Sequence, residues 1–231
     1  MKTLILLISL LIIISNAYSQ NFDTINIDFT KTVKHGTSNE IVKGTFYYSE
    51  IRTILAVQEP LNQWMIIEFN NMLIYYPDKN RAINITSQNP FNIPFFQTFT
   101  GLNSENLGLS KLGYTIDKNE IHGDTLLVYW QPPVVNEMKL GEIILSLVDN
   151  NIVVTETKDH SGNTNSYTTY NNYISHNDHY FPLLVNSTIY SEGETKTEII
   201  KYTNPVFDQP LPDEITNFIL PENAEIKEIE W

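Results

Sequence analysis

The residues best suited to chemistry form one small cluster, His176-Asn177-Asp178-His179. Two imidazoles and a carboxylate could together bind a metal ion. The cluster lies in a polar link between two predicted strands, however, where a helical i, i+3 alignment of the histidines is not expected. No third ligand at a suitable spacing is evident. We therefore interpret the cluster as a solvated turn and predict no metal site.

Motifs for nucleophilic or cofactor chemistry are also missing. The segment from Gly108 to Gly113 comes nearest to a Gly-x-Ser-x-Gly elbow, but it has one residue too many and follows no strand. The sequence contains no calcium loop, Walker loop or dinucleotide-binding glycine pattern. It also lacks cysteine, which excludes disulfides, thiol nucleophiles and Cys-ligated metals. We predict a protein that is not an enzyme, with no catalytic residue and no cofactor.

The charge balance argues against nucleic acid as a partner. The 231 residues include 14 Lys plus Arg against 27 Asp plus Glu, a formal net charge of −13. Such a chain repels a phosphate backbone unless its cations are clustered, and no run of Lys or Arg occurs.

The N-terminal residues have the composition of an export signal. Lys2 precedes a mostly apolar segment from Leu4 to Ile14, and Ala17-Tyr18-Ser19 supplies small residues before a cleavage site. The apolar segment covers 11 residues, whereas a membrane-spanning helix needs about 20. We predict a cleaved signal peptide over residues 1–19 and a single exported domain over residues 20–231.

Composition and turn spacing predict a mainly β domain. The chain has 29 Ile, 22 Thr and 13 Tyr against only four Ala, which favours pleated strands over helices. Short β-rich runs alternate with turn residues at the spacing of an antiparallel meander, and their links are too brief for parallel crossovers. The predicted strands cover residues 25–33, 41–48, 53–57, 63–69, 72–76, 81–85, 125–130, 140–148, 151–158, 166–174, 180–190, 196–203 and 224–229.

A segment rich in Phe and Pro interrupts the strands between residues 88 and 113. Pro90 and Pro94 disfavour strand pairing there, and Pro94 suits the first turn of a helix. Four aromatic residues share this segment, namely Phe91, Phe95, Phe96 and Phe99. We predict a small helical flap, with a second short helix from Ser104 to about Leu112.

Several predicted strands are apolar on both faces. In the run from Gln63 to Phe69, Trp64 and Ile66 project to one face, while Met65 and Ile67 project to the other. An antiparallel sheet with one hydrated face should instead alternate apolar and polar residues. Either the sheet curls on itself to bury both faces, or one face holds apolar material that the chain does not supply.

An ordered set of motifs extends over nearly the whole exported chain. It begins with Ile27-Asp28-Phe29-Thr30-Lys31-Thr32-Val33 and Gly44-Thr45-Phe46-Tyr47-Tyr48. An Asn70-Asn71 turn then joins two β-rich runs, the second ending in Tyr76-Pro77-Asp78, and a segment from Ile219 to Ile226 closes the chain. This set resembles the LolA-type periplasmic carriers of outer-membrane lipoproteins.

The resemblance implies a strongly curved antiparallel sheet that forms an incomplete barrel, closed by short lid helices, whose concave face binds acyl chains. The implied lipid-binding residues are Phe46, Tyr48, Trp64, Ile66, Ile74 and Tyr76 in the strands, with Phe91, Phe95, Phe96 and Phe99 in the lid. The chain departs from the family in lacking the basic residue expected in the strand from Ile54 to Val57, because Arg52 lies two or three positions early.

We therefore expect a monomeric periplasmic carrier that escorts acylated lipoproteins to the outer membrane. The resemblance implies that inner-membrane release machinery supplies the cargo and that an outer-membrane acceptor receives it. Two alternatives stay open. One is a lipid-sensing or protein-binding scaffold of the same fold, and the other is a hydrolase that acts on cell-envelope material.

Overall fold

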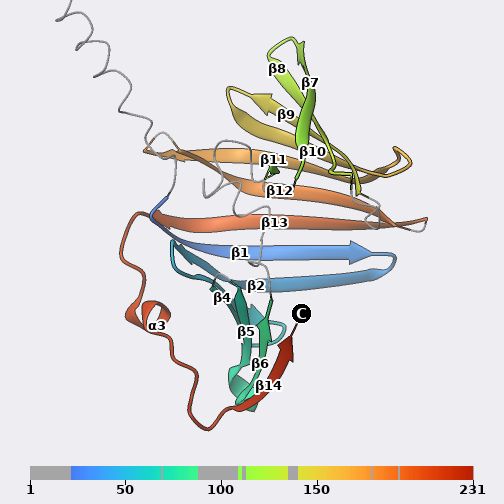
Figure 1. Ribbon diagram of the computed structural model, residues 1–231. Helices are drawn as coiled ribbons and strands as arrows, with labels where there is room; N and C mark the ends of the chain where they lie inside the picture. Colours follow the sequence, from blue (N-terminus) through green and yellow to red (C-terminus); the bar gives the residue numbers. More distant parts are fainter. Residues whose placement is uncertain are drawn as a thin grey trace, which may run out of the picture.

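The computed structural model describes residues 22–68, 70–87, 109–110, 113–134, 140–177, 179–191 and 193–230. These residues form one open sheet of 14 strands (Figure 1). The strands are β1 (Thr24–His35), β2 (Ser38–Ser49), β3 (Thr53–Glu59), β4 (Gln63–Glu68), β5 (Asn71–Tyr76), β6 (Arg81–Thr86), β7 (Thr115–His122), β8 (Thr125–Gln131), β9 (Leu140–Val148), β10 (Asn151–Asp159), β11 (Thr164–His176), β12 (His179–Ser191), β13 (Glu194–Phe207) and β14 (Glu225–Glu230). Every strand predicted from the sequence has a counterpart, and β7 is an additional strand.

Two antiparallel meanders build the sheet. The strands from β1 to β6 follow one another in space, as do those from β7 to β13, and β1 pairs with β13 to join the two sets. That join extends from Ile25 opposite Phe207 to His35 opposite Lys196. The prediction of a wholly antiparallel sheet is wrong at one edge, where β14 pairs with β6 in parallel. This pairing is possible because a long C-terminal segment, rather than a short turn, leads from β13 to β14 (Figure 1).

The hairpin links use residues that tolerate left-handed backbone conformations. Asp149 and Asn150 both have positive φ, 49° and 63°, and they form the two-residue link between β9 and β10. Such turns match the twist of the strands that they join. The predicted Asn70-Asn71 turn is one position too late, because Asn71 already pairs with Glu68 across β4 and β5.

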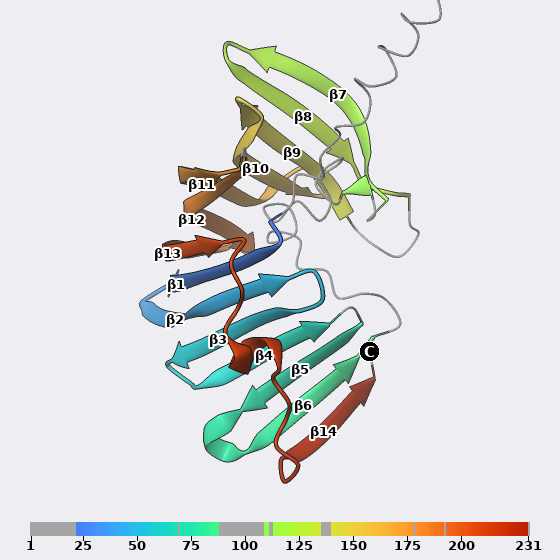
Figure 2. The same ribbon diagram turned by 90° about the vertical axis from the view of Figure 1, so that its left-hand side faces the viewer.

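The sheet is strongly curved and does not close into a barrel. Figure 2 shows the strands β7–β9 and the strands β6 and β14 bending toward the same side of the sheet. The largest apolar cluster contains Ile27, Phe46, Phe181, Val185 and Tyr202, from the strands on either side of the β1–β13 join. We call the face that carries these residues the inner face and the opposite one the outer face.

Helical structure is sparse in the described part of the chain. It comprises a 3-10 turn at Pro77–Lys79 and the one-turn helix α3 at Asp213–Thr216. Helix α3 belongs to the segment between β13 and β14, which runs along one side of the sheet (Figure 2). The predicted helical flap between residues 88 and 113, with its four phenylalanines, lies almost entirely outside the described residues.

Candidate functional site

The register of β2 to β6 creates an apolar row across the inner face. Phe46 lies opposite Leu55, Leu55 opposite Met65, Met65 opposite Ile74, and Ile74 opposite Ile83. Residues directly opposite each other in antiparallel strands project from the same face. The row therefore continues the core from Phe46 outward along the inner face.

Beyond the core, most of this apolar surface is half-buried, although Ile67, opposite Met72, is only 7% exposed. Phe46 is 1% exposed and belongs to the main cluster, and Leu55 packs against that cluster. Two positions away from Ile74 along β5, Met72 lies opposite Ile85 on the same face. We define the apolar strip as Met65, Met72, Ile74, Ile83 and Ile85, all of which are half-buried. None of the three core clusters found among the described residues contains them.

The outer face of the same strands is covered by the chain itself. Ile54 and Ile66 pack there against Ile215 of α3, which is 2% exposed. The Trp64 ring lies 5.1 Å from the ring of Phe218. The C-terminal segment therefore explains why β3 to β6 need apolar residues on both faces, because it supplies the cover for the outer one.

Arg52 binds the C-terminal segment at the end of α3. Its Nη1 lies 3.3 Å from the carbonyl oxygens of Ile215 and Thr216 and 3.5 Å from that of Phe218. The guanidinium also forms a 2.5 Å ion pair with Glu68 on β4. A cation here satisfies carbonyl groups that the end of a helix leaves without intrahelical partners. Arg52 thus acts at the outer face, away from the apolar strip.

The structure separates the lipid-binding residues that were predicted together. Phe46, Tyr48, Ile74 and Tyr76 lie on the inner face, the first two in the closed core and the last two within or beside the apolar strip. Trp64 and Ile66 lie on the outer face beneath the C-terminal segment. The phenylalanines of the predicted flap, Phe91, Phe95, Phe96 and Phe99, lie outside the described residues.

Sequence reasoning missed four members of the strip, namely Met65, Met72, Ile83 and Ile85. The signal that would have found them is the register between β4 and β5. That register places Met65, rather than Trp64 or Ile66, opposite Ile74. Alternation along one strand divides its residues into two sets, but only pairing shows which set joins which set on the next strand.

The inner face is also apolar in the second meander. Trp130 on β8 and Leu145 on β9 form a second cluster with Leu109 and Tyr114, against which Val128 packs. The Oη of Tyr114 donates a hydrogen bond to the carbonyl oxygen of Gly141 at 3.3 Å. Apolar side chains therefore line the inner face at both ends of the sheet.

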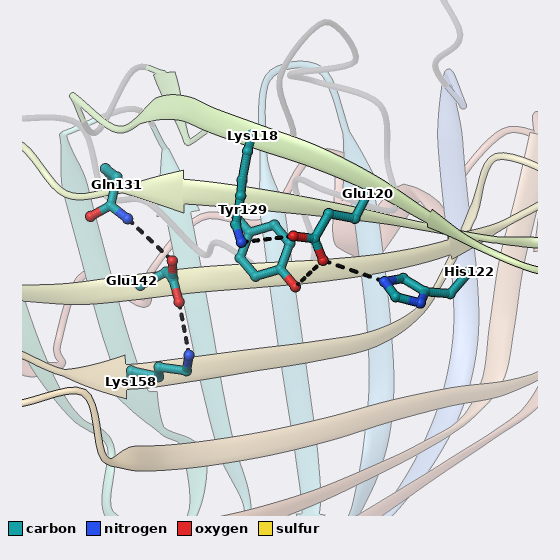
Figure 3. Close-up of polar contacts among 7 residues, drawn as sticks. All are labelled: Lys118, Glu120, His122, Tyr129, Gln131, Glu142 and Lys158. Atoms are coloured by element: carbon teal, nitrogen blue, oxygen red, sulfur yellow. Dashed lines mark hydrogen bonds and ion pairs between the residues drawn. The ribbon is translucent and has the colours of Figure 1, made fainter.

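The outer face of β7 to β10 carries a network of polar side chains (Figure 3). Glu120 accepts hydrogen bonds from Lys118 at 2.8 Å and from Tyr129 at 3.0 Å, and His122 lies 3.3 Å away. These contacts, that from Lys118 foremost, lower the pKa of Glu120 to about 2. Glu142 bonds in the same way with Lys158 and Gln131. A network of charged and polar side chains of this kind is typical of a hydrated surface.

The histidine cluster has a structural role. The Nε2 atom of His176 lies 3.0 Å from Asp208 Oδ2, and its ring lies 5.4 Å from that of Phe207. The ring of His179 packs against Phe22 at 5.2 Å. Within the described ranges, no group of three or more His, Cys, Asp or Glu is arranged to hold a metal ion. No helix there has the length and apolar character to cross a membrane.

Several solved structures share this architecture. A domain from Vibrio parahaemolyticus, described as an outer membrane lipoprotein-sorting protein domain, matches with a TM-score of 0.63 at 13% identity, over 88% of this chain and 92% of that one. A LolA superfamily protein from Nitrosomonas europaea matches with a TM-score of 0.55 at 13% identity, over 84% and 89%. A DUF1329 family protein from Desulfovibrio piger matches with a TM-score of 0.62 at 11% identity, over 84% and 89%.

Comparison by sequence found no match, either to a family model or to a curated protein. At 11% to 13% identity the structural likeness defines the fold alone. The protein has a LolA-like fold, a curved open sheet in which one apolar face is not fully covered by the described chain.

Proposed function

We propose that the inner face binds the acyl chains of lipoproteins and that the protein, as a monomer, carries them through the periplasm to the outer membrane. The observation that carries this proposal is the apolar strip. Met65, Met72 and Ile74 are half-buried, whereas the opposite face of the same strands is covered by the C-terminal segment. Among the described residues, the C-terminal segment thus covers the outer face of these strands, while the apolar strip on the inner face stays half-buried.

An acyl chain has the physical properties that this surface requires. Each CH₂ group removed from water contributes about 0.8 kcal/mol, so complete burial of a 12-carbon chain is worth at most about 9 kcal/mol. This contribution depends on continuous apolar contact and not on a charged partner. A row that extends from Leu55 across Met65 and Ile74 to Ile83 offers such contact over four adjacent strands.

The context of the fold supports a role in sorting. One structural neighbour is described as a lipoprotein-sorting domain and another as a LolA superfamily protein. The predicted signal peptide over residues 1–19 would export the chain. A carrier of this kind would receive lipoproteins from release machinery in the inner membrane and deliver them to an acceptor in the outer membrane.

A binding assay on residues 20–231 tests the site. The probe is a fluorescent C12 fatty acyl ester, and the key variant is Ile74→Asp, which places a charge in the apolar strip. We expect this variant to weaken binding at least tenfold, because burying an unpaired carboxylate against an acyl chain is unfavourable. Ile219→Asp is the matched control, since Ile219 is 84% exposed outside the sheet. Met72→Gln, which alters the strip without a charge, covers the case in which Ile74→Asp does not fold.

Equal binding by the wild type, the two strip variants and the control would contradict the proposed site.

A second assay tests transport. The protein is incubated with vesicles that contain a triacylated lipopeptide, the vesicles are removed by centrifugation, and the supernatant is analysed by native mass spectrometry. A soluble one-to-one complex supports a carrier. Binding without extraction from the vesicles would instead favour the sensing or scaffold alternative.

A further inference from the structure

The row of apolar residues on the inner face ends at a lysine. Ile74 on β5 lies opposite Ile83 on β6, and Ile83 lies opposite Lys227 on the edge strand β14 (Figure 2). Residues that pair directly across neighbouring strands project from the same face, because side chains alternate along each strand. Lys227 therefore lies beside the apolar strip, one strand beyond Ile83.

Two side-chain contacts support this assignment of faces. Arg81 Nε donates to Glu225 Oε2 at 2.8 Å, and Glu225 lies two positions before Lys227, on the same face of β14. Asn84 Nδ2 donates to Glu228 Oε2 at 2.8 Å on the opposite face. Because Glu228 directly follows Lys227 in the strand, the two side chains project to opposite sides. Lys227 thus belongs to the inner face.

Lys227 is an unpaired cation at this end of the inner face. The residue is exposed, and no ion pair among the described residues includes it. The neighbouring cation, Arg81, is by contrast paired with Glu225 at 2.8 Å. A ligand that lies on the apolar strip would therefore have one uncompensated positive charge next to its end.

This arrangement fits a molecule with an apolar chain and a single negative charge at one end. A carboxylate carries one charge, and its oxygens accept hydrogen bonds from an ammonium group such as that of Lys227. A phosphate monoester carries about −1.5 to −2 charges at neutral pH, and Glu225, on the same face two positions away, would repel the excess. The chain of a fatty carboxylate would lie along the row from Ile83 to Leu55.

The row also limits the length of chain that fits. From β14 to β3 the sheet has four strand spacings of about 4.8 Å, or about 19 Å in total. A staggered chain of C–C bonds advances about 1.3 Å per carbon, so about 14–16 carbons cover this distance. Beyond Leu55 the row reaches Phe46, which is 1% exposed and belongs to the main core cluster. A longer chain therefore gains no further apolar contact along the row.

We propose that the apolar strip binds a free fatty acid of about 14–16 carbons, whose carboxylate pairs with the ammonium group of Lys227. This inference rests on the proposed function, because both use the apolar strip, and it adds a ligand class and an anchoring residue. Lys227 fixes one end of the chain at the edge of the sheet, and Phe46 limits the other end.

Two probes with the same chain separate the charge from the apolar contact. Tetradecanoate and 1-tetradecanoylglycerol are titrated at neutral pH, below their critical micelle concentrations, against residues 20–231 by displacement of a fluorescent apolar dye. An exposed ion pair corresponds to about a 2- to 5-fold effect, so Lys227→Gln should weaken tetradecanoate binding by this factor and leave the glycerol ester unchanged. Lys201→Gln is the matched control and should change neither affinity, since Lys201 is exposed and precedes Tyr202 of the inner-face core.

The outcomes separate this inference from the proposed function. An unchanged affinity of Lys227→Gln for tetradecanoate, or equal losses for both probes, would overturn the inference while leaving acyl binding intact. Tetradecyl phosphate is a third probe, and binding tighter than that of tetradecanoate would overturn the assignment of a carboxylate. Binding of none of the probes would instead overturn the proposed function.

A chain-length series tests where the chain lies. The affinity of the wild type should rise from decanoate onward and level off at about 14–16 carbons, because only the CH₂ groups that lie on the row are removed from water. An affinity that rises at the same rate through octadecanoate would contradict the placement of the chain between Lys227 and Phe46.

Discussion

Helix α3 and its flanking residues should be the main stabiliser of the outer face, and Ile215→Ala tests this directly. Ile215 is 2% exposed and packs against Ile54 and Ile66. It is the residue of the C-terminal segment that lies in the core of this cluster, whereas Leu211 and Phe218 pack at its margin. Shortening its side chain therefore removes the central contact between the segment and the sheet.

The expected cost follows from the depth of burial. Replacing a buried Ile by Ala typically destabilises by about 2–5 kcal/mol, and the value falls where the site can collapse. Helix α3 has one turn, Asp213–Thr216, and it lies on the sheet surface, so it can settle toward Ile54. We expect a loss of about 2–3 kcal/mol in the free energy of unfolding. For a domain of this size that lowers the midpoint of thermal unfolding by about 4–12 °C.

The assay combines thermal unfolding with hydrogen exchange. Circular dichroism measures the midpoint, and exchange mass spectrometry follows the peptide that contains the amides of Thr216 and Asn217, which donate to Pro212 and Asp213. Faster exchange in this peptide alone would show local release of the segment. The control is Ile219→Ala, since an exposed residue should change stability by less than about 0.5 kcal/mol. A midpoint within 1 °C of the wild type, together with unchanged exchange, would refute the inferred role of the segment.

Three further predictions concern single side chains. Arg52→Gln should lower the free energy of unfolding by about 1–2 kcal/mol, measured by denaturant titration. The reason is that the ion pair with Glu68 and the hydrogen bonds to the end of α3 are lost together. An unchanged midpoint would contradict the inferred role of Arg52 in holding the C-terminal segment. Gly44→Ala should lower the free energy of unfolding by about 2 kcal/mol or more in the same assay, since a Cβ at this position collides with the carbonyl oxygen of Ala56. A stability equal to that of the wild type would show that β2 and β3 can move apart to admit the methyl group without loss. Glu120 should titrate near pH 2 by NMR, so its contribution to stability is present above about pH 4.5 and is lost as the pH falls through about 2. In Lys118→Met the pKa of Glu120 should rise toward its ordinary value, and no change would contradict the assigned cause.

Local sequence signals predicted most of the strands but not all of them. The alternation and turn residues on either side of Asp149 define β9 and β10 because a two-residue link fixes the pairing of its neighbours. Strand β7, Thr115–His122, was missed because its residues are mostly exposed and polar, which is common in a strand at the edge of a sheet. The parallel pairing of β14 with β6 was also missed, since 144 residues separate Arg81 from its partner Glu225.

The sequence predicted apolar residues on both faces of the strands, but it did not predict which of them share a face. Apolar residues on both faces of β4 indicated that the face bearing Trp64 and Ile66 needs a cover, which the C-terminal segment supplies. The assignment of Trp64 and Ile66 to the same set as Ile74 depended on an assumed register. In the structure, Ile74 lies opposite Met65, and the two other residues contact the C-terminal segment.

The sequence by itself determined that this protein is acidic and mainly β, with short antiparallel hairpins, because those properties depend on composition and on residues close in the chain. Its motif order also indicated the LolA-like fold. Only the tertiary structure decided which apolar face the chain covers for itself. That decision depends on contacts such as Arg52 with Phe218 and Ile54 with Ile215, which join residues more than 150 positions apart. No local pattern encodes such contacts, because each joins residues that lie far apart in the sequence.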